Sequence, residues 1–262
     1  MKIVTTQFDG PVSTDYKKLL TVFKKSVEQY MPGVDFVELI LEAPEKRTDK
    51  KYGFISNSAK LESWVEFLRT CKDDVIFTDC DMLMLKSAQG AFDSEFDIAY
   101  TKRYRSSHIP INGGVVMVRP NERSIDFFEK YLEANNRMLR DGKFHAHWRA
   151  KYHGINQAAF GYMLEEGEHN AKMHVYDTRD WNAVDCDWPF INKNTVFLHV
   201  KGAMREVLQR RMPHGPKRGA MQLWYDTAGI EYIEEVGGES KRINRLLDLM
   251  TKRRLAKEGF IV

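Results

Sequence analysis

Two carboxylates one residue apart are the residues best suited to chemistry in this chain. Asp79 and Asp81 interrupt an otherwise apolar run from Val75 to Leu85. At the carboxyl end of a strand in an α/β sheet, such a pair can face a hard divalent cation, directly or through water. Burying carboxylates is costly unless a cation or donors offset the cost. The spacing predicts a metal site able to hold a diphosphate, although an acidic turn after a strand also fits the pair taken alone.

A second polar group stands just before an expected strand near 115–118. Asn112 offers a donor and an acceptor to hydroxyl groups, and the glycine pair beginning at Gly113 lets a ligand approach the backbone. An ordinary turn entering a strand explains this piece equally well. Asn156 and Gln157 open an expected helix, where a capping role is the usual one.

A third group follows an expected strand near 196–199. His199 is a possible metal ligand, Gly202 would let the backbone approach a phosphate, and Arg205 could neutralise it. A single histidine after a strand is more often structural. Taken in order with the acidic pair and the Asn-Gly-Gly segment, however, these residues predict one shared site.

The N-terminal stretch is a candidate nucleoside contact. We expect a first strand over 3–6 and, at its end, an N-terminal loop over 5–9, where nucleotides are met in this fold class. Thr5, Thr6 and Asp9 are therefore candidates for binding the base and ribose. The chain has neither Gly-x-Gly-x-x-Gly nor a Gly-Lys-Ser/Thr phosphate loop. These absences argue against a nicotinamide enzyme or a nucleoside triphosphatase, so a diphosphate would need a metal instead.

The elements that must position these residues alternate along the chain. Hydrophobic periodicity predicts a βαβαβ start, which favours an α/β fold with a mostly parallel sheet and helices on both faces. The expected helices are 16–30, 59–70 and 121–139, and the expected strands are 3–6, 34–41, 75–78, 97–100, 115–118 and 196–199.

Composition sets the broad class. The 262 residues are 43% hydrophobic, which predicts a globular protein, and we expect one domain over 1–262 with a basic helical extension at about 206–262. The net charge of +3 is too small to indicate nucleic-acid binding. We expect helix 240–257 to pack on the body with a solvated basic face, with weak membrane-surface contact as the alternative. Three cysteines and no signal-like or membrane segment predict a cytoplasmic protein.

The succession of motifs resembles the GT-A type, metal-dependent sugar-nucleotide glycosyltransferases. The similarity is greatest to the family-8 group, which includes glycogenin and bacterial lipopolysaccharide galactosyltransferases. Asp79 and Asp81 match its Asp-x-Asp motif. His199, Gly202 and Arg205 match its His-x-x-Gly-x-x-Lys motif, with arginine in place of lysine. The resemblance implies a Rossmann-like, mixed and mostly parallel sheet.

The resemblance extends to further site residues. Asn112 falls on the Asn-(Ser/Ala)-Gly motif that contacts the sugar, and Lys60 falls where the group has a basic residue that reaches the donor. Asn156 and Gln157 fall on an Asp-Gln pair, with an amide replacing the acid. The Trp-Asn pair at 181–182 matches the one preceding the final strand.

By this resemblance, the expected activity is transfer of a hexose from a UDP-sugar to a hydroxyl acceptor, a glycan. Mn²⁺, or Mg²⁺ in its place, would be held by Asp79, Asp81 and His199, and Arg205 would stabilise the leaving diphosphate. A retaining course would place Gln157 or Asn156 near the anomeric carbon. Inversion would need a carboxylate base. The aspartates in the right stretch for that base are Asp177, Asp180, Asp185 and Asp187.

One segment fits an acceptor-side role. Lys143 to His153 carries three histidines among aromatic and basic residues, but it lacks the acidic or thiolate ligands that would complete a second metal site. We interpret it as a loop in which Trp148 and Tyr152 could stack on a sugar.

Two other functions share the expected fold. A nucleotidyltransferase that forms sugar nucleotides usually has a glycine-rich basic loop after the first strand, which this chain lacks. A non-catalytic sugar-nucleotide-binding module would keep Lys60 and Asn112 but could dispense with His199 and Arg205. The presence of the last two residues favours an enzyme.

Overall fold

The computed structural model describes residues 1–10, 16–43, 52–103, 110–184, 187–200, 223–224 and 226–227. The chain divides into two compact units, each assembled from separate segments. The first unit contains 1–13, 34–79 and 89–177, and the second contains 14–33, 80–88 and 178–262. The alternation means that the polypeptide passes from one unit to the other several times.

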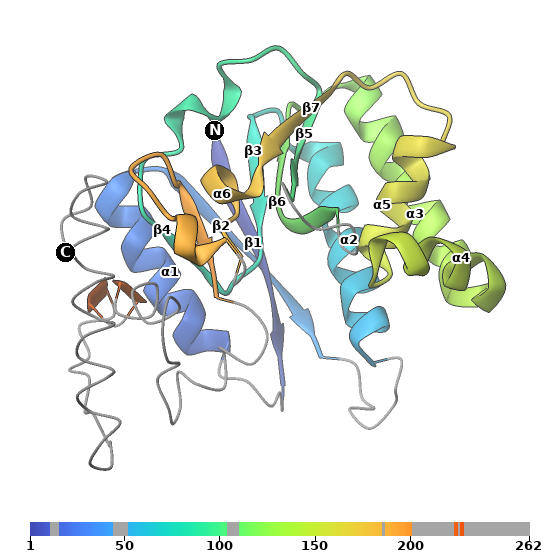
Figure 1. The fold of residues 1–262 in the computed structure, drawn as a ribbon, viewed down its shortest axis with the longest axis horizontal. Coiled ribbons are helices and arrows are strands. Elements are labelled where there is room, and N and C mark those ends of the chain that lie inside the picture. Colours follow the sequence, from blue (N-terminus) through green and yellow to red (C-terminus); the bar gives the residue numbers. More distant parts are fainter. Residues whose placement is uncertain are drawn as a thin grey trace. The chain divides into compact units, whose positions relative to one another are not determined.

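The first unit is built on a six-stranded sheet with the order β2-β1-β3-β6-β5-β7 (Figure 1). β1 is parallel to β2 and β3, β6 is antiparallel to both β3 and β5, and β7 is parallel to β5. All strands except β6 therefore point the same way, as the mostly parallel prediction requires. The strands are β1 (Lys2–Asp9), β2 (Asp35–Glu42), β3 (Val75–Thr78), β5 (Ile98–Lys102), β6 (Ile111–Val118) and β7 (Met173–Asp177).

Four helices pack with this sheet in the first unit, and a short 3-10 helix, η1 (Gln89–Phe92), precedes β5. An aromatic cluster forms the centre of the core: the Phe77 ring of β3 stacks on Trp64, with centroids 4.4 Å apart, and lies 6.1 Å from that of Phe128. Such pairs bury large apolar surfaces in defined orientations, which fixes the helices against the strands. The helices are α2 (Tyr52–Thr70), α3 (Glu122–Arg140), α4 (Gly142–Tyr152) and α5 (Asn156–Glu165).

The second unit has its own small sheet and core. β4 (Met82–Met84) pairs antiparallel with β8 (Phe197–His199), and the Ser26 hydroxyl of α1 (Tyr16–Tyr30) accepts from the Met84 N–H at 2.9 Å. α6 (Thr178–Trp181) and the short η2 (Trp188–Phe190) also belong to this unit. Trp224 is 1% exposed and belongs to this second core, against which Leu223 also packs.

The structure corrects three expectations. The segment at 5–9 was expected to be a loop, but it lies within β1, because β1 pairs with β2 as far as Asp9 and Glu42. The segment at 143–153 was also expected to be a loop, yet it is largely α4, whose first turn is capped by the Asp141 carboxylate. α2 begins at Tyr52 rather than near 59. The expected C-terminal helix at 240–257 lies outside the described residues.

The expectation that Trp148 and Tyr152 stack on a sugar is wrong, because both lie in α4 and are buried. Trp148 and Tyr152 are 3% and 5% exposed and belong to the core of the first unit. A Cβ added to Gly161 of α5 would meet the Tyr152 ring at 2.2 Å, so α4 and α5 approach too closely there for any side chain. Neither ring is accessible to a sugar.

A buried carboxylate fixes the start of α3. Asp97 accepts hydrogen bonds from the guanidinium of Arg123, from the backbone N–H of Lys172 and from the side chain of Asn121, the N-cap of α3. Burial raises the pKa of Asp97, but these donors outweigh burial and lower it to about 2. The network joins β5, α3 and the segment before β7.

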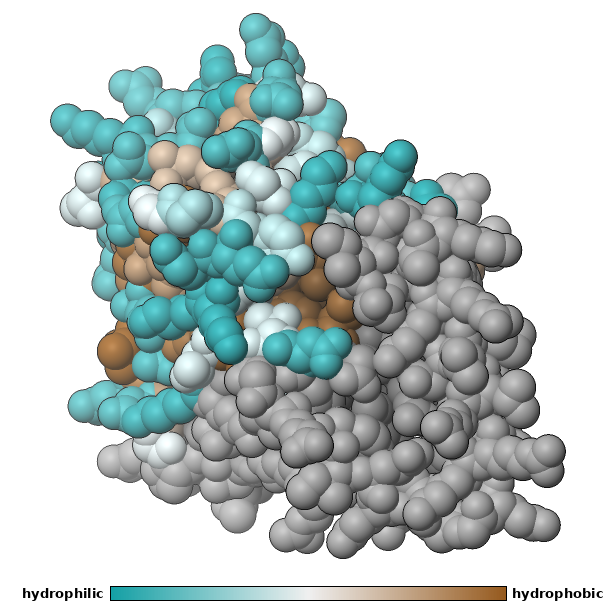
Figure 2. Space-filling view, turned by 90° about the vertical axis from the view of Figure 1, so that its left-hand side faces the viewer, coloured by the Kyte–Doolittle hydropathy of each residue, from teal (hydrophilic) through white to brown (hydrophobic). Residues whose placement is uncertain are grey.

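The face shown in Figure 2 carries mainly hydrophilic side chains where its residues are described, with a smaller hydrophobic area between them. Among the described helices, none combines the length and the apolar character that crossing a bilayer requires.

Replacing Asp97 with asparagine tests the network. Because the folded pKa lies below the ordinary value of 3.8, the charge stabilises the fold above that value, and the contribution is lost as pH falls towards about 2. We expect Asp97→Asn to lower the free energy of unfolding at pH 7 by about 2 kcal/mol and to flatten its pH dependence between about 5 and 2. Urea unfolding across this pH range measures both effects.

The matched control is Glu95→Gln, which removes an exposed carboxylate paired with Lys172. Exposed ion pairs contribute little, so this variant should unfold like the wild type. Equal losses in the two variants would contradict the special role of Asp97.

Candidate functional site

Several of the expected site residues lie at the edge of the main sheet where β1, β2 and β3 end. Asp79 directly follows β3, and its backbone N–H donates to the carbonyl of Gly114 in β6 at 3.0 Å. Because β6 is antiparallel to β3, its first residues lie at the same edge. Asn112, near the start of β6, therefore lies at the same edge of the sheet as Asp79.

The Asn-Gly-Gly segment lies inside β6, not before it. The register between β5 and β6 shifts there, because Thr101 pairs with Asn112 whereas Tyr100 pairs with Val116. Such an irregularity re-aims side chains and is common beside functional sites. The Asn112 side-chain oxygen accepts from the Gly114 N–H at 2.9 Å, which holds the amide within the irregular segment.

Gln157 and Asn156 begin α5 beside this segment. A Cβ added at Gly113 would lie 3.9 Å from the Gln157 Cγ, so these two residues are neighbours. The Gln157 amide donates to the Tyr152 carbonyl at 3.0 Å, and the Asn156 amide donates to the Asn57 carbonyl at 2.8 Å. Both amides are thus positioned by backbone carbonyls of neighbouring elements.

Tyr131 of α3 anchors the same helix start. Its hydroxyl donates to the Asn156 carbonyl at 3.0 Å, and burial raises the pKa of Tyr131 far above its ordinary range. The hydroxyl therefore stays protonated at any physiological pH and remains a donor.

Lys60 of α2 lies against the first acidic residue. Its ammonium is 2.5 Å from an oxygen of Asp79 and 4.6 Å from the centroid of the Trp64 ring. The Trp64 indole N–H in turn donates to the Thr6 hydroxyl at 3.1 Å. Trp64 is a residue that no motif in the sequence indicates, although its spacing of four residues from Lys60 on a helix was a usable signal.

The three candidate nucleoside contacts lie along β1. The Thr5 hydroxyl donates to the Thr78 carbonyl at 3.1 Å, and both Thr5 and Thr6 are buried. Asp9 is exposed at the end of the strand. The hydroxyls of Thr5 and Thr6 already have partners within the protein, and the role of all three residues in nucleoside binding stays a prediction.

Asp81 and His199 form a buried pair in the second unit. The His199 Nε2 lies 3.3 Å from an Asp81 oxygen, and each residue is only 2% exposed. The pairing of β4 with β8 sets Met82 opposite His199, and the Val200 N–H donates to the Asp81 carbonyl at 2.8 Å. The backbone hydrogen bonds between these two segments therefore fix the positions of both Asp81 and His199.

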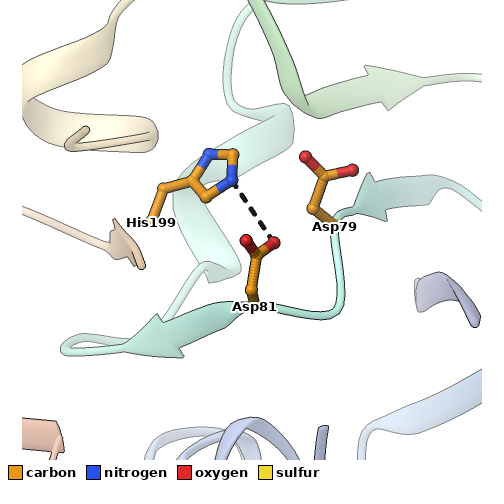
Figure 3. A group of neighbouring side chains, drawn as sticks. All are labelled: Asp79, Asp81 and His199. Atoms are coloured by element: carbon orange, nitrogen blue, oxygen red, sulfur yellow. Dashed lines mark ion pairs between the residues drawn. The ribbon is translucent and has the colours of Figure 1, made fainter. Parts of the chain in front are cut away.

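Asp79, Asp81 and His199 together offer three ligand atoms that lie within 4.8 Å of one another. Figure 3 shows the two carboxylates and the imidazole turned towards one another. No other group of three such ligands occurs among the residues that the structure describes. Because bonds to a divalent ion measure about 2.0–2.6 Å, two ligands of one ion can lie about 4–5 Å apart, so the spacing fits a shared ion.

The donor set also suits the expected metal. Two carboxylates and one imidazole combine the hard oxygen ligands preferred by Mg²⁺ and Mn²⁺ with a nitrogen that favours a transition metal. Asp81 is buried in this cluster, where an uncompensated charge would be costly. The residues present therefore fit a divalent cation, while their assignment as ligands stays a prediction.

Two residues expected to contact the phosphates cannot be placed from the described part of the structure. Gly202 and Arg205 fall outside the described residues, as does Asp185. Their roles remain predictions from the sequence.

The contact between Lys60 and Asp79 generates a test. The ammonium occupies an oxygen that a cation would use and adds a positive charge beside it, so Lys60→Met should strengthen binding of Mn²⁺ alone. Since a hydrogen bond between charged groups contributes about 1.5–3 kcal/mol, we expect a gain of about 10–100-fold in affinity. Titration followed by electron paramagnetic resonance of unbound Mn²⁺ measures it.

Arg69→Met is the matched control, because Arg69 lies on the same helix and makes an exposed ion pair with Glu129. Its Mn²⁺ affinity should equal that of the wild type. Unchanged or weaker Mn²⁺ binding by Lys60→Met would show that Lys60 does not compete with the ion.

Comparisons with solved structures show where this fold occurs. A glycosyltransferase involved in the glycosylation of the major capsid of PBCV-1 aligns with a TM-score of 0.53 and 17% identity, covering 78% of this chain and 96% of that one. The galactosyltransferase LgtC, in complex with donor and acceptor sugar analogs, aligns with a TM-score of 0.57 and 13% identity, covering 90% and 98%. At these identities the likeness establishes the GT-A fold.

A third similar structure is the glycosyltransferase GlyE of Streptococcus pneumoniae TIGR4, with a TM-score of 0.59 and 9% identity. The alignment covers 90% of this chain but 66% of GlyE. A search among curated protein sequences found no match.

The family comparison is more specific. The family model described as nucleotide-diphospho-sugar transferase matches residues 60–213, which is more than half of the chain and begins at Lys60. The match contains the acidic pair, the Asn-Gly-Gly segment, the start of α5 and the final histidine motif. The chain belongs to the nucleotide-diphospho-sugar transferase family.

Proposed function

We propose that this protein is a metal-dependent glycosyltransferase that moves a hexose from a UDP-sugar to a hydroxyl group of a glycan. The observation that carries the proposal is the convergence of Asp79, Asp81 and His199 in a chain of this family. A diphosphate needs cationic partners, and the chain has no glycine-rich phosphate loop to supply them. Mn²⁺, or Mg²⁺ in its place, is the cation that this donor set supports.

Each residue of the site would have a separate role in binding the metal ion or the diphosphate. Asp79, Asp81 and His199 would hold the metal ion, which when bound supplies charge neutralisation to the diphosphate. The Lys60 ammonium, which pairs with Asp79 at the edge of the cluster, would instead pair with an oxygen of the bound sugar nucleotide. Arg205 would stabilise the leaving diphosphate from the C-terminal side, as the family motif implies.

The sugar would lie over the irregular part of β6. Asn112 and Gly113 adjoin Gln157 there, and an amide next to an uncrowded backbone can orient sugar hydroxyls. Both amides donate an N–H to a backbone carbonyl, and Gln157 is the one that adjoins Gly113, which favours Gln157 as the candidate near the anomeric carbon. Neither amide can serve as a general base.

The family resemblance favours a retaining course, in which the leaving phosphate accepts the proton of the acceptor hydroxyl. An inverting enzyme would need a carboxylate base within reach of that hydroxyl. Asp177 ends β7, Asp180 lies in α6, and Asp187 is 7% exposed just before η2. Product analysis by nuclear magnetic resonance distinguishes the two courses directly from the anomeric configuration.

The decisive test removes one ligand charge without changing side-chain size. Asp81→Asn should lower the metal-dependent release of nucleoside diphosphate from a sugar nucleotide by at least ~10²–10³-fold, since electrostatic stabilisation of the leaving group is lost. The assay uses a panel of nucleoside-diphosphate sugars with Mn²⁺, with Mg²⁺ and with chelator.

Asp126→Asn serves as the control, because Asp126 is an exposed residue of α3 paired with Lys130. It should retain full activity. Wild-type turnover that is insensitive to chelator would contradict metal dependence. Release of pyrophosphate from a nucleoside triphosphate and a sugar phosphate would instead identify a nucleotidyltransferase.

A further inference from the structure

Asn182 lies directly behind the histidine of the cluster. It follows α6 in sequence, is completely buried, and its side-chain oxygen is 3.0 Å from the Nδ1 of His199. This nitrogen is the one on the far side of the ring from Asp81, because Nε2 is the atom that lies 3.3 Å from the Asp81 carboxylate. Asn182 therefore contacts one ring nitrogen of the His199 imidazole, and Asp81 contacts the other.

The backbone holds Asn182 in this place. The Ala183 N–H donates to the Phe197 carbonyl at 2.8 Å, and the His199 N–H donates to the Ala183 carbonyl at 2.9 Å. These two bonds bracket Leu198, to which Ala183 forms a parallel bridge. The Asn182 N–H donates to the Thr178 carbonyl at 2.9 Å. The side-chain amide is consequently fixed relative to His199 by the same pairing that forms β8.

The position of Asn182 matters because a neutral imidazole carries a proton on only one nitrogen. Asp81 alone would favour the proton on Nε2, where the N–H could donate to its carboxylate. An N–H at that nitrogen cannot bind a metal ion. An acceptor at Nδ1 opposes this preference, since it draws the proton to the other side of the ring.

We propose that Asn182 is a positioning residue that holds His199 in the Nδ1–H tautomer, so that the Nε2 lone pair faces a divalent cation shared with Asp81. This inference rests on the proposed function for the identity of the cation. Metal-bound histidines are generally oriented by an acceptor on the second nitrogen, and loss of that partner typically costs about 10–100-fold in metal affinity. An uncharged amide performs the task here, so it adds no further negative charge to a cluster that already has two carboxylates.

The test compares two substitutions of similar size. Asn182→Leu removes the acceptor, whereas Asn182→Asp keeps an oxygen at the same place. In the metal-free protein, ¹⁵N spectra of the His199 ring report which nitrogen carries the proton. We expect the Nδ1–H tautomer in the wild type and in Asn182→Asp, and a shift towards Nε2–H in Asn182→Leu. Mn²⁺ titration should show affinity about 10–100-fold weaker for Asn182→Leu and restored by Asn182→Asp.

Asn135→Leu is the control for the cost of removing a buried amide. Asn135 is also completely buried and donates to the Ser58 hydroxyl at 2.7 Å, but it makes no contact with His199 among the interactions described. It should lose stability without changing the His199 tautomer or the Mn²⁺ affinity. A merely structural role for Asn182 would make the two leucine variants behave alike.

The outcomes separate the inference from the function on which it rests. An Nε2–H tautomer in the wild type, or in a folded Asn182→Asp, would overturn the inference even if Asn182→Leu failed to fold. Equal Mn²⁺ affinity in the wild type and a folded Asn182→Leu would overturn it while leaving the metal site in place. A wild type with the Nδ1–H tautomer that binds no divalent cation would overturn the proposed function, and the inference with it.

Discussion

A carboxylate that is almost fully removed from water must be compensated, and Asp81 imposes this condition on the structure around it. The effective penalty for burying one ion is several kcal/mol, and a second carboxylate at Asp79 adds repulsion. The chain sets an imidazole nitrogen 3.3 Å from an Asp81 oxygen, on a strand whose backbone pairing leaves little freedom. Such a grouping is poor as a salt bridge and well suited to a cation.

The local signals in the sequence were enough to identify much of this arrangement. β3 ends at Thr78 as predicted, because a short run of apolar β-branched and aromatic residues meets an acidic residue. α1 and α3 follow their hydrophobic stripes closely. The acidic pair and His199 were recognised from residue type and order, and the structure brings them together.

Other features depend on partners that are distant in sequence. β4 and β8 have three residues each and exist because they pair with each other, with more than a hundred residues between them. β7 forms against β5 and has little alternation of its own. α4 was missed because its histidines and aromatic residues show no clear stripe, and its capping by Asp141 is what marks its start. Likewise, the place of Asn112 inside β6 follows from a register shift that only the partner strand reveals.

The pairing of Lys60 with Asp79 has a consequence for how the protein reaches its folded state. Small zinc domains stay unfolded without their ion because nothing else balances their ligands. Here an ammonium from α2 already balances one of the two carboxylates, and the same ammonium lies over Trp64, whose ring stacks on Phe77 in the core. The protein itself therefore offsets the charge of Asp79, so this carboxylate does not depend on an ion for its compensation while the chain folds.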